Sequence, residues 1–412
     1  MKKFSKVLLS SMLALGGLLS NAAVSQVNAQ EEYDLVVWED VNKGIGIAAA
    51  VEKFEAEHGV NILVIEKTYA QQLEDLRLDG PAGSGPDVFT MPADQIGTAV
   101  VEGLVKEVNA DDAVKASFTE ASIQSQTVDG KLYGLPKSVE TQILFYNKDL
   151  IAEEDLPDTL EGWYELSQNN TSDAYAFLAL FDQLYYTMGV IGGYGGYIFN
   201  QDENGNYLPE DIGLNNAGAV EAVDFVSKFY TEKLFPDGII GEQGINVLEA
   251  LFVEGRVQAV ISGPWNLEPF TSAGLNYGVK ELPMLPNGEH MQSVAGVKSY
   301  NISSYTKNPE LAEEFLLFIT NEENSLVRYE ETLEVPAVLA LSEHPTVVEN
   351  DAAEAIALQS EHAKLVPGIV QMNEVWNSMD PALQIVMNGQ ATAQEALDIA
   401  VQQIILTNQA LQ

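Results

Sequence analysis

The sequence has 412 residues, with 61 acidic and 20 basic side chains, a formal net charge of −41 and no cysteine. A surface so acidic repels phosphate groups and anionic lipids, which argues against nucleic acid as a partner. Without cysteine the chain has no disulfide, thiolate metal ligand or thiol nucleophile, and we expect no lipid attached through a cysteine. The length predicts two or more domains.

The first 29 residues have the pattern of a secretory signal peptide. Lys2, Lys3 and Lys6 precede an apolar run, 7–19, and small and polar residues follow up to Ala29. The apolar run is shorter than the roughly 20 residues that a membrane-spanning helix needs. We therefore expect residues 1–29 to be removed and the rest to be an exported, monomeric protein, extracellular or periplasmic and associated with the cell envelope.

The chain after the signal peptide alternates strands and helices. The pattern predicts a β-α-β unit from strands at 32–39 and 60–67 and a helix at 45–59 that Gly59 ends. A short helix at 69–78, a glycine-rich turn, a strand at 87–90 and a helix at 94–103 follow. Alternation of this kind predicts a mainly parallel sheet covered by helices, an α/β fold.

The later part of the chain is more helical. Apolar spacing predicts helices at 161–169, 217–233 and 247–254, and then strands at 257–263, 276–285 and 294–303. Beyond Asn308 the pattern is almost wholly helical, and it ends with the apolar stripe of Ala393, Leu397, Ala400 and Ile404. The chain shows no fixed-period repeat and no low-complexity linker.

One carboxylate lies directly before an apolar run that is typical of a core strand. Glu140 interrupts the stretch YGLPKSVETQILFYNKDL, residues 133–150. A buried carboxylate is costly unless another group pairs with it. Glu140 therefore either lies at an exposed strand start or faces a polar cavity, and the local sequence leaves both interpretations open.

An ordered series of motifs resembles the maltose- and maltodextrin-binding proteins of ABC importers. The series runs through LVVWEDVNKG, SGPDVF, GKLYGLPKSVETQILFYNKDL, GGYIF, EALFVEGRVQAVISGPWNL, NYGVKELPMLPNG and VQMNEVWNSM, and covers nearly the whole chain after the signal peptide. The resemblance implies a periplasmic-binding-protein-like fold, in which a hinge of several segments joins two α/β lobes around a sugar cleft. It also implies closure around the ligand and recognition by the membrane permease subunits of an ABC transporter.

The resemblance suggests lobe boundaries and site residues. The implied amino-terminal lobe is 30–138 with 299–333, and the carboxy-terminal lobe is 139–298 with 334–412. Sugar rings stack on aromatic faces and their hydroxyls bind polar side chains. The ligand-binding residues that match the family's motifs are Asp40, Asn42, Lys43, Met91, Asp94, Glu140, Gln183, Tyr185, Trp265 and Trp376. Trp38 and Trp163 fall outside the stacking positions and are expected to pack in the core.

The chain departs from the family's pattern at several positions of the cleft. Met91 replaces a tryptophan, Gln95 an arginine, Gln183 an acid and Leu267 a second tryptophan. These departures leave the preferred sugar open among maltose, a longer maltodextrin, a cyclodextrin and a different oligosaccharide.

The main alternative is a secreted glycoside hydrolase that uses two of Glu140, Asp94 and Asp40. Such an enzyme needs two carboxyls roughly 5 Å or 6.5 to 9.5 Å apart, which a sequence cannot measure. The chain has no G-x-S-x-G motif, and no two of its four histidines have a metal-ligand spacing. A charged ligand would require arginines in the cleft, and the chain has only three. We therefore expect a binding protein with no catalytic residue, no cofactor and no metal.

Overall fold

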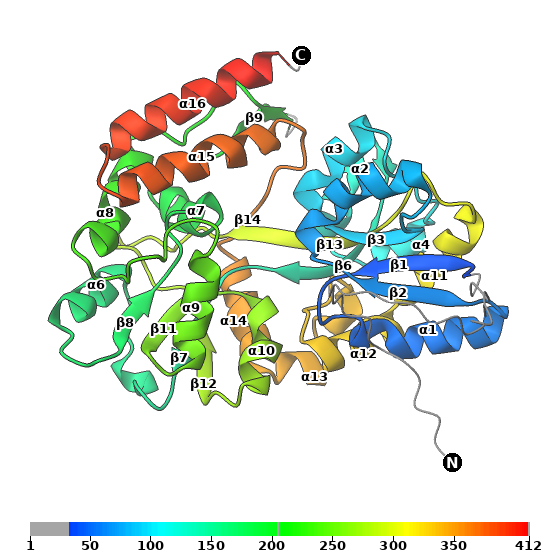
Figure 1. Ribbon diagram of the computed structural model, residues 1–412, viewed down its shortest axis with the longest axis horizontal. Coiled ribbons are helices and arrows are strands. Elements are labelled where there is room, and N and C mark those ends of the chain that lie inside the picture. Colours follow the sequence, from blue (N-terminus) through cyan, green and yellow to red (C-terminus); the bar gives the residue numbers. More distant parts are fainter. Residues whose placement is uncertain (1–32, 204–205, 411–412) are drawn as a thin grey trace, which may run out of the picture. The chain divides into compact units, whose positions relative to one another are not determined.

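The computed structural model describes residues 33–203 and 206–410, so the predicted signal peptide lies outside the described residues. Both described ranges belong to one compact unit. Within the described ranges, no helix is long and apolar enough to cross a membrane. The helices and strands gather around two separate sheets (Figure 1).

The first sheet has six strands. They are β1 (Leu35–Glu39), β2 (Ile62–Glu66), β3 (Val88–Pro92), β6 (Leu135–Glu140), β13 (Val294–Ile302) and β14 (Lys364–Leu365). The order is β14-β13-β3-β1-β2, and β6 pairs with β13. β1 pairs in parallel with β2 and β3, whereas β13 runs antiparallel to both β3 and β6. The predicted β-α-β unit is therefore confirmed.

The second sheet has four strands in the order β12-β7-β11-β8. They are β7 (Ile143–Asn147), β8 (Tyr175–Leu178), β11 (Val257–Ser262) and β12 (Tyr277–Lys280). Only β11 and β8 are parallel, because β7 runs antiparallel to β11 and to β12. The parallel pairing predicted from residues 32–103 holds for β1, β2 and β3 of the first sheet. The second sheet differs, because β6 and β7 continue one extended segment and β7 runs against its neighbours. Two short hairpins are β4 (Thr127–Val128) with β5 (Lys131–Leu132), and β9 (Asn200–Gln201) with β10 (Tyr207–Leu208).

Helices surround both sheets (Figure 1). The α-helices are α1 (Ile45–His58), α2 (Gln72–Ala82), α3 (Ile96–Val101), α4 (Asp112–Ala116), α5 (Glu120–Gln124), α6 (Leu160–Asn169), α7 (Leu184–Gly193), α8 (Ala217–Thr231), α9 (Gly244–Val253), α10 (Leu267–Ser272), α11 (Pro309–Ile319), α12 (Glu322–Thr332), α13 (Pro345–Val348), α14 (Asp351–Ser360), α15 (Met372–Met387) and α16 (Ala393–Gln409). Short 3₁₀ helices are η1 (Tyr69–Gln71), η2 (Ala93–Gln95), η3 (Glu153–Asp155), η4 (Pro264–Asn266) and η5 (Leu339–Leu341).

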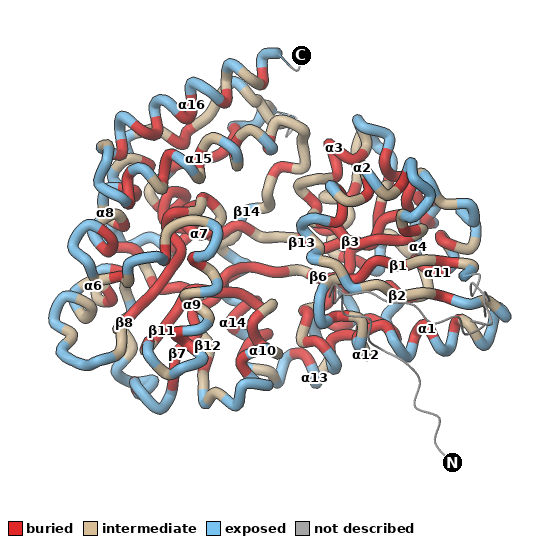
Figure 2. Tube along the Cα trace, viewed as in Figure 1, coloured by how far each residue is buried: buried red, intermediate tan, exposed pale blue. Residues whose placement is uncertain are grey.

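Each sheet has its own hydrophobic core (Figure 2). Successive strand residues point to opposite faces, so β1 turns Leu35 and Val37 towards α1 and α11 but Trp38 towards α2 and α3. The second sheet is packed within one large cluster that also holds the apolar faces of α7, α8, α15 and α16. Trp38 and Trp163 are 1% and 0% exposed, which confirms the prediction that they are packing residues.

Three segments connect the two sheets. β6 leads through Thr141 and Gln142 into β7, and β13 returns to the first sheet. Further along, Ala337, Val338 and Leu341 still pack in the core of the first sheet, whereas Ala352 packs in that of the second. The lobe boundaries stay a proposal, and we place the last one within 342–351 rather than after 333, because side chains of 337–341 fill the first core.

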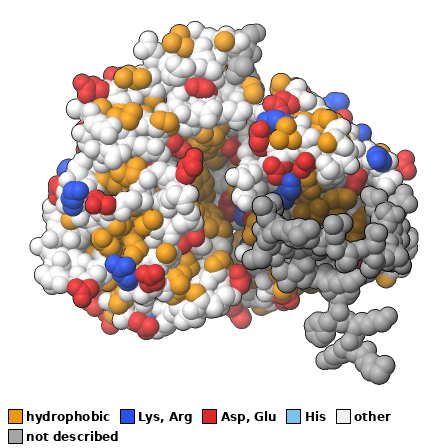
Figure 3. Space-filling view, viewed as in Figure 1, with side chains coloured by type: hydrophobic (Ala, Val, Ile, Leu, Met, Phe, Trp, Pro, Cys, Tyr) orange, Lys and Arg blue, Asp and Glu red, His pale blue; other side chains and the backbone are white. Residues whose placement is uncertain are grey.

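Acidic side chains are spread over the visible face of the molecule (Figure 3). They do not gather into one acidic patch on that face, and lysine and arginine side chains are fewer. This distribution fits the interpretation of the negative charge as a solvated surface.

Candidate ligand-binding site

A cavity of about 240 Å³ lies where the first and second sheets are joined. It is bordered by the ends of β3 and β6, the start of β13, the segment after β14, and helices α7 and α15. Its lining residues are Tyr69, Ala70, Pro92, Ala93, Asp94, Gln95, Ser125, Glu140, Tyr185, Ala295, Gly296, Val297, Leu365, Val366 and Trp376. Aromatic rings and carboxylates therefore share one cavity with small apolar side chains.

Glu140 ends strand β6 and faces this cavity with only 8% of its surface exposed. Its Oε2 lies 3.2 Å from Nζ of Lys298, and its Oε1 accepts a 3.3 Å hydrogen bond from the hydroxyl of Tyr69. Gly296 is the cross-strand partner of Glu140, and a Cβ there would lie 3.0 Å from Cγ of Glu140. The lack of a side chain at 296 thus leaves room for the carboxylate of Glu140. The pairing with Lys298 offsets the cost of burying that carboxylate.

Lys298 supplies the positive charge beneath the cavity. Burial by itself would lower its pKa, but the carboxylates of Glu140, Glu334 and Asp40 outweigh burial and raise it. Its ammonium also lies 4.6 Å from the centre of the Tyr69 ring. Lys298 is therefore a fixed, shared counter-ion that leaves no net cation free for a ligand.

Asp94 and Trp376 meet across the cavity from η2 and α15. The indole Nε1 of Trp376 donates a 3.1 Å hydrogen bond to Oδ2 of Asp94. Burial raises the pKa of Asp94, and the hydrogen bond from Trp376 counteracts part of that rise. The pair holds the face of an indole at the edge of the cavity, beside a carboxylate acceptor.

Tyr185 and Trp265 form an aromatic pair, with ring centres 6.1 Å apart and planes inclined by 55°. Gln142 donates a 2.6 Å hydrogen bond to the backbone carbonyl of Tyr185 and so fixes the start of α7. The Tyr185 hydroxyl and the Trp265 indole nitrogen are both buried, and neither has a hydrogen-bond partner in the part of the chain that the structure describes. Burial raises the pKa of Tyr185 well above its usual value, so the phenol stays protonated and able to donate.

Of the residues predicted to bind ligand, Asp94, Glu140, Tyr185 and Trp376 line the cavity, and Trp265 packs on Tyr185. The structure thus brings together the aromatic residues and two of the carboxylates.

Two other predicted residues lie next to residues of the cavity but do not line it themselves. Asp40 lies 3.8 Å from Nζ of Lys298, and its Oδ1 accepts a 3.1 Å hydrogen bond from the backbone N–H of Tyr69. Gln183 precedes α7, and its carbonyl accepts hydrogen bonds from the Tyr186 and Thr187 backbone. Neither side chain is part of the cavity lining.

The remaining predicted residues lie outside the cavity. Asn42 is exposed in a turn with a positive φ of 62°. Lys43 is buried, and its Nζ donates a 3.1 Å hydrogen bond to the carbonyl of Thr332. Met91 is 0% exposed, because β3 directs it with Phe89 into the core beneath α2 and α3.

Sequence reasoning missed Tyr69 and Lys298 as site residues. Tyr69 lines the cavity from a turn that resembles an ordinary helix start. Lys298 lies within the apolar strand sequence VAGVKSYNI, and a lysine in such a strand requires a buried carboxylate as partner. Lys298 within an apolar strand needs an acidic partner, and Glu140 before an apolar run needs a basic one. These two needs together are the sequence signal that could have predicted the pair.

Comparisons with known proteins show that the chain is similar to solute-binding proteins. The family described as bacterial extracellular solute-binding protein matches residues 49–355. A galactooligosaccharide-binding protein of Bacillus subtilis is 55% identical over 95% of this chain and 93% of its own length. A maltodextrin-binding protein of the same organism is 34% identical over 97% of this chain and 96% of its own.

Solved structures are also similar over nearly the whole chain. A cyclo/maltodextrin-binding protein in complex with maltotetraose has a TM-score of 0.78 and 32% identity, covering 93% of this chain and all of its own. MalX from Streptococcus pneumoniae with maltopentaose has a TM-score of 0.84 and 30% identity, covering 90% of this chain and 100% of its own. These likenesses confirm the predicted two-lobed α/β fold class.

Proposed function

This chain belongs to the family of bacterial extracellular solute-binding proteins, and we propose that it captures a neutral oligosaccharide for delivery to an ABC importer. The predicted resemblance to sugar-binding members of this family is thereby confirmed. A relative in Streptococcus pneumoniae that is 31% identical is named as the solute-binding lipoprotein of a maltooligosaccharide ABC transporter. This relative supports a membrane permease as the partner of the present chain.

The observation that carries the proposal is the combination of buried acceptors and an unpartnered donor at one cavity. Glu140, Asp94 and Tyr185 all line the cavity: the two acids offer carboxylate oxygens, and the Tyr185 hydroxyl has no hydrogen-bond partner among the described residues. Sugar hydroxyls both donate and accept hydrogen bonds, and sugar C–H faces lie on aromatic rings, so a sugar satisfies each of these groups.

The charge of the site favours a ligand without charge. Neither lysine nor arginine occurs among the described residues that line the cavity, and Lys298 beneath it is already paired with Glu140. An anionic ligand would meet Glu140 and Asp94 without a free cation. A neutral polyol avoids that repulsion and gains charge-assisted hydrogen bonds from the carboxylates.

We favour galactooligosaccharides as the preferred ligand. The relative with 55% identity over almost the whole chain is named for these sugars, whereas the relatives named for maltodextrins are 31 to 34% identical.

A maltodextrin is the second candidate. It was the ligand predicted from the motif series, and structures of similar proteins contain maltotetraose and maltopentaose. Both sugars are neutral, and both would use the aromatic pair and the carboxylates.

Binding without hydrolysis is the chemistry that the carboxylates support. Glu140 is paired with Lys298, and Asp94 accepts a hydrogen bond from Trp376, so both acids already serve as acceptors. A retaining or inverting glycosidase would instead need one protonated acid beside the glycosidic oxygen and a second free carboxylate. We therefore propose that sugars leave the cavity intact.

The test is calorimetric titration of the mature chain with β-1,4-galactotriose, maltotriose, maltotetraose and β-cyclodextrin. We expect galactotriose to bind at least tenfold more tightly than any α-glucan, and Glu140→Gln to weaken that binding by tenfold or more. The matched control is Glu153→Gln, because Glu153 also pairs with a lysine, Lys280 at 2.8 Å, but at the surface. Chromatography of the sugars after incubation should show no cleavage.

Each other outcome has a definite meaning. Tighter binding of an α-glucan would transfer the assignment to maltodextrins. Binding of no sugar in the panel would contradict the proposed ligand class. Release of shorter sugars that stops in Glu140→Gln would establish the glycosidase alternative.

A further inference from the structure

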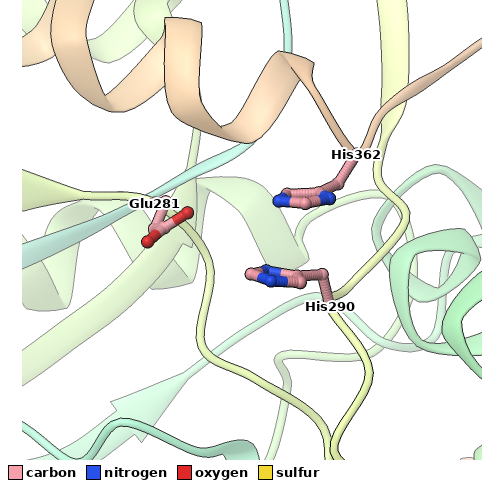
Figure 4. Close-up of side chains that lie close together, drawn as sticks. All are labelled: Glu281, His290 and His362. Carbon is pink, nitrogen blue, oxygen red and sulfur yellow. The ribbon is translucent and has the colours of Figure 1, made fainter.

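Two of the four histidines lie side by side, next to a carboxylate, away from the sugar cavity. The rings of His290 and His362 are stacked, with centres 3.6 Å apart and planes inclined by 10°. Glu281 points its carboxylate towards the same ends of both rings (Figure 4). The potential ligand atoms of all three residues lie within 4.8 Å of one another.

These residues come from three separate segments. Glu281 follows β12, His290 precedes β13, and His362 lies between α14 and β14. Their sequence separation explains why no spacing motif revealed them. Each side chain is partly buried, so solvent ions can still reach the group.

A buried glutamine fixes the three segments relative to one another. Gln359 is 2% exposed, and its Oε1 accepts a 3.0 Å hydrogen bond from the backbone N–H of Leu282. Its Nε2 donates to the carbonyl of Met291 at 2.9 Å, and its own carbonyl accepts from the backbone N–H of His362 at 3.1 Å. One residue thus holds all three segments: its side chain binds the backbone next to Glu281 and His290, and its backbone carbonyl binds the N–H of His362.

We propose that Glu281, His290 and His362 form a binding site for a divalent transition metal, with zinc as the best match. Imidazole nitrogen and carboxylate oxygen are common zinc ligands, and two histidines with one glutamate leave a fourth, tetrahedral position for water. The large negative charge of the chain, −41, raises the local concentration of cations at the surface. A set with two imidazoles discriminates against calcium and magnesium, which prefer oxygen ligands.

Metal binding requires a small change in the side chains. A metal lies in the plane of the imidazole that binds it, so the two ring planes, now nearly parallel, must converge towards the metal near Glu281, and the rings must separate at their far ends. Zinc-to-ligand distances are about 2.0 to 2.2 Å, which places two ligands roughly 3.3 Å apart and draws Glu281 inwards. These are side-chain rotations that the fixed backbone permits.

The proposed role of the metal is to fix the segment that leads into β13 against the segment that leads into β14. Val294 and Ala295 pair with Lys364 and Leu365 of β14, directly after the segments that carry His290 and His362. Leu365 and Ala295 also line the sugar cavity. A bound metal would tie these segments together and raise the stability of the folded chain by favouring the native state.

The experiment uses the mature chain, purified without a histidine tag and treated with a chelator. We expect zinc to bind with one metal per chain in calorimetry and to raise the thermal unfolding temperature. His290→Ala and His362→Ala should each weaken zinc binding by at least tenfold, and Glu281→Gln, which keeps the shape of the side chain, should weaken it less. The zinc titration is repeated in excess magnesium, which occupies sites made only of surface carboxylates. Zinc binding that depends on His290 and His362 should persist under these conditions.

The matched control is His344→Ala, which removes a different histidine of the chain. His344 accepts a 3.3 Å hydrogen bond from Thr346 at a helix start and is not part of the metal-binding group. Circular dichroism of each variant shows whether it folds, and sugar titration reports independently on the other site. Absence of saturable zinc binding, or zinc binding that His290→Ala and His362→Ala leave unchanged, would overturn the proposal.

Discussion

At the scale of single residues, the cavity depends on the ion pair between Glu140 and Lys298, which offsets the cost of burying the acid. Glu140 would be expensive to bury alone, but Lys298 lies 3.2 Å away on the neighbouring strand. Glu334 also lies 3.6 Å from the same ammonium, so Lys298 compensates more than one acid. Glu140 therefore faces the cavity with its counter-ion on the neighbouring strand beneath it.

The hydroxyl of Tyr185 provides a test of ligand binding separate from stability. Because this buried group has no hydrogen-bond partner among residues 33–203 and 206–410, Tyr185→Phe should leave the free energy of unfolding nearly unchanged. A sugar that accepts its hydrogen bond should bind about tenfold more weakly to the variant, equivalent to about 1.4 kcal/mol. Calorimetry and urea unfolding measure the two quantities.

Tyr230→Phe is the matched control for this prediction. The Tyr230 hydroxyl is buried as well, but it donates a 3.0 Å hydrogen bond to the carbonyl of Ala179. Its loss should cost about 1 kcal/mol of stability and leave sugar affinity unchanged. If Tyr185→Phe instead lost stability and kept its affinity, the hydroxyl would have no role in binding.

Part of the site could be predicted from residues alone, and part could not. Glu140 attracted attention because an acid before an apolar run needs a partner. Met91 could have been placed correctly, since strand alternation puts it on the same face as Phe89. Lys298 could have been found as well, because a lysine within an apolar strand needs a buried carboxylate as its partner. The pairing of His290 with His362 could not, because it depends on contacts between distant segments that local patterns do not contain.

At the scale of elements, β13 organises the candidate site. This nine-residue strand pairs with β14 at its start and with β3 and β6 further along. It carries Gly296 and Lys298, and Glu140 on β6 faces them. One long strand therefore sets the position of the carboxylate, its counter-ion and the space between them.

Helix α3 approaches the chain before α15 closely, and Gly97 permits this approach. A Cβ at 97 would lie 2.7 Å from the carbonyl oxygen of Gly368 and 3.2 Å from Cα of Ile369. Since both atoms belong to the backbone, they cannot rotate away. The same contact region holds the hydrogen bonds from Asn373 to Thr98, at 2.9 Å, and from Trp376 to Asp94.

We predict that Gly97→Ala separates α3 from this segment. Overpacking of this kind typically costs about 1 to 3 kcal/mol of stability. Sugar affinity should fall at least fivefold, because Asp94 and Trp376 lose their relative placement. Urea unfolding and sugar calorimetry on the same preparation give both values.

The control for Gly97→Ala is Gly189→Ala in α7. There a Cβ would meet the flexible end of Met291 at 3.1 Å, which can rotate, so stability and affinity should change little. Unchanged sugar affinity in Gly97→Ala, with normal folding, would show that the close approach is irrelevant to binding.

The ends of helices show where the sequence patterns predicted a boundary wrongly and where they predicted it correctly. The helix predicted to end at Leu78 continues to Ala82, despite Pro81, and ends at Gly83 with a φ of 76°. Proline near the last turn removes one hydrogen bond, which packing of the helix against the sheet offsets. The α1 helix was predicted well because strong periodicity and Gly59 agree with each other.

At the scale of the whole molecule, a buried charge network joins strands of the first sheet to the chain after α12. Glu334 lies 2.9 Å from Lys137 on β6 and 3.6 Å from Lys298 on β13. Lys137 in turn lies 2.6 Å from Glu39 on β1. The segments that connect the two sheets are thus held by ion pairs in a region of low solvent exposure, where such pairs are strong.

This network predicts how the molecule responds to acid. Burial would raise the pKa of Glu334, but Lys137, Lys298 and Lys43 outweigh it and lower the pKa to about 2 from 4.5. A carboxyl whose pKa is lower in the folded state adds stability above its unfolded pKa and loses it as pH falls towards its folded pKa. The contribution should therefore be complete above about pH 4.5 and disappear between pH 4.5 and pH 2.

Mild acid also neutralises part of the net charge of −41, and the loss of surface repulsion acts in the opposite direction. Comparison with Glu334→Gln separates the two effects, because both proteins share the same surface. We expect the wild type to be more stable than the variant by up to about 3 kcal/mol at pH 6, and this difference to shrink steadily from pH 4.5 downwards. Urea unfolding at a series of pH values measures it, with the exposed Glu349→Gln as a control that should match the wild type at every pH. A difference that stays constant down to pH 2.5 would show that Glu334 does not hold the connecting segments through its charge.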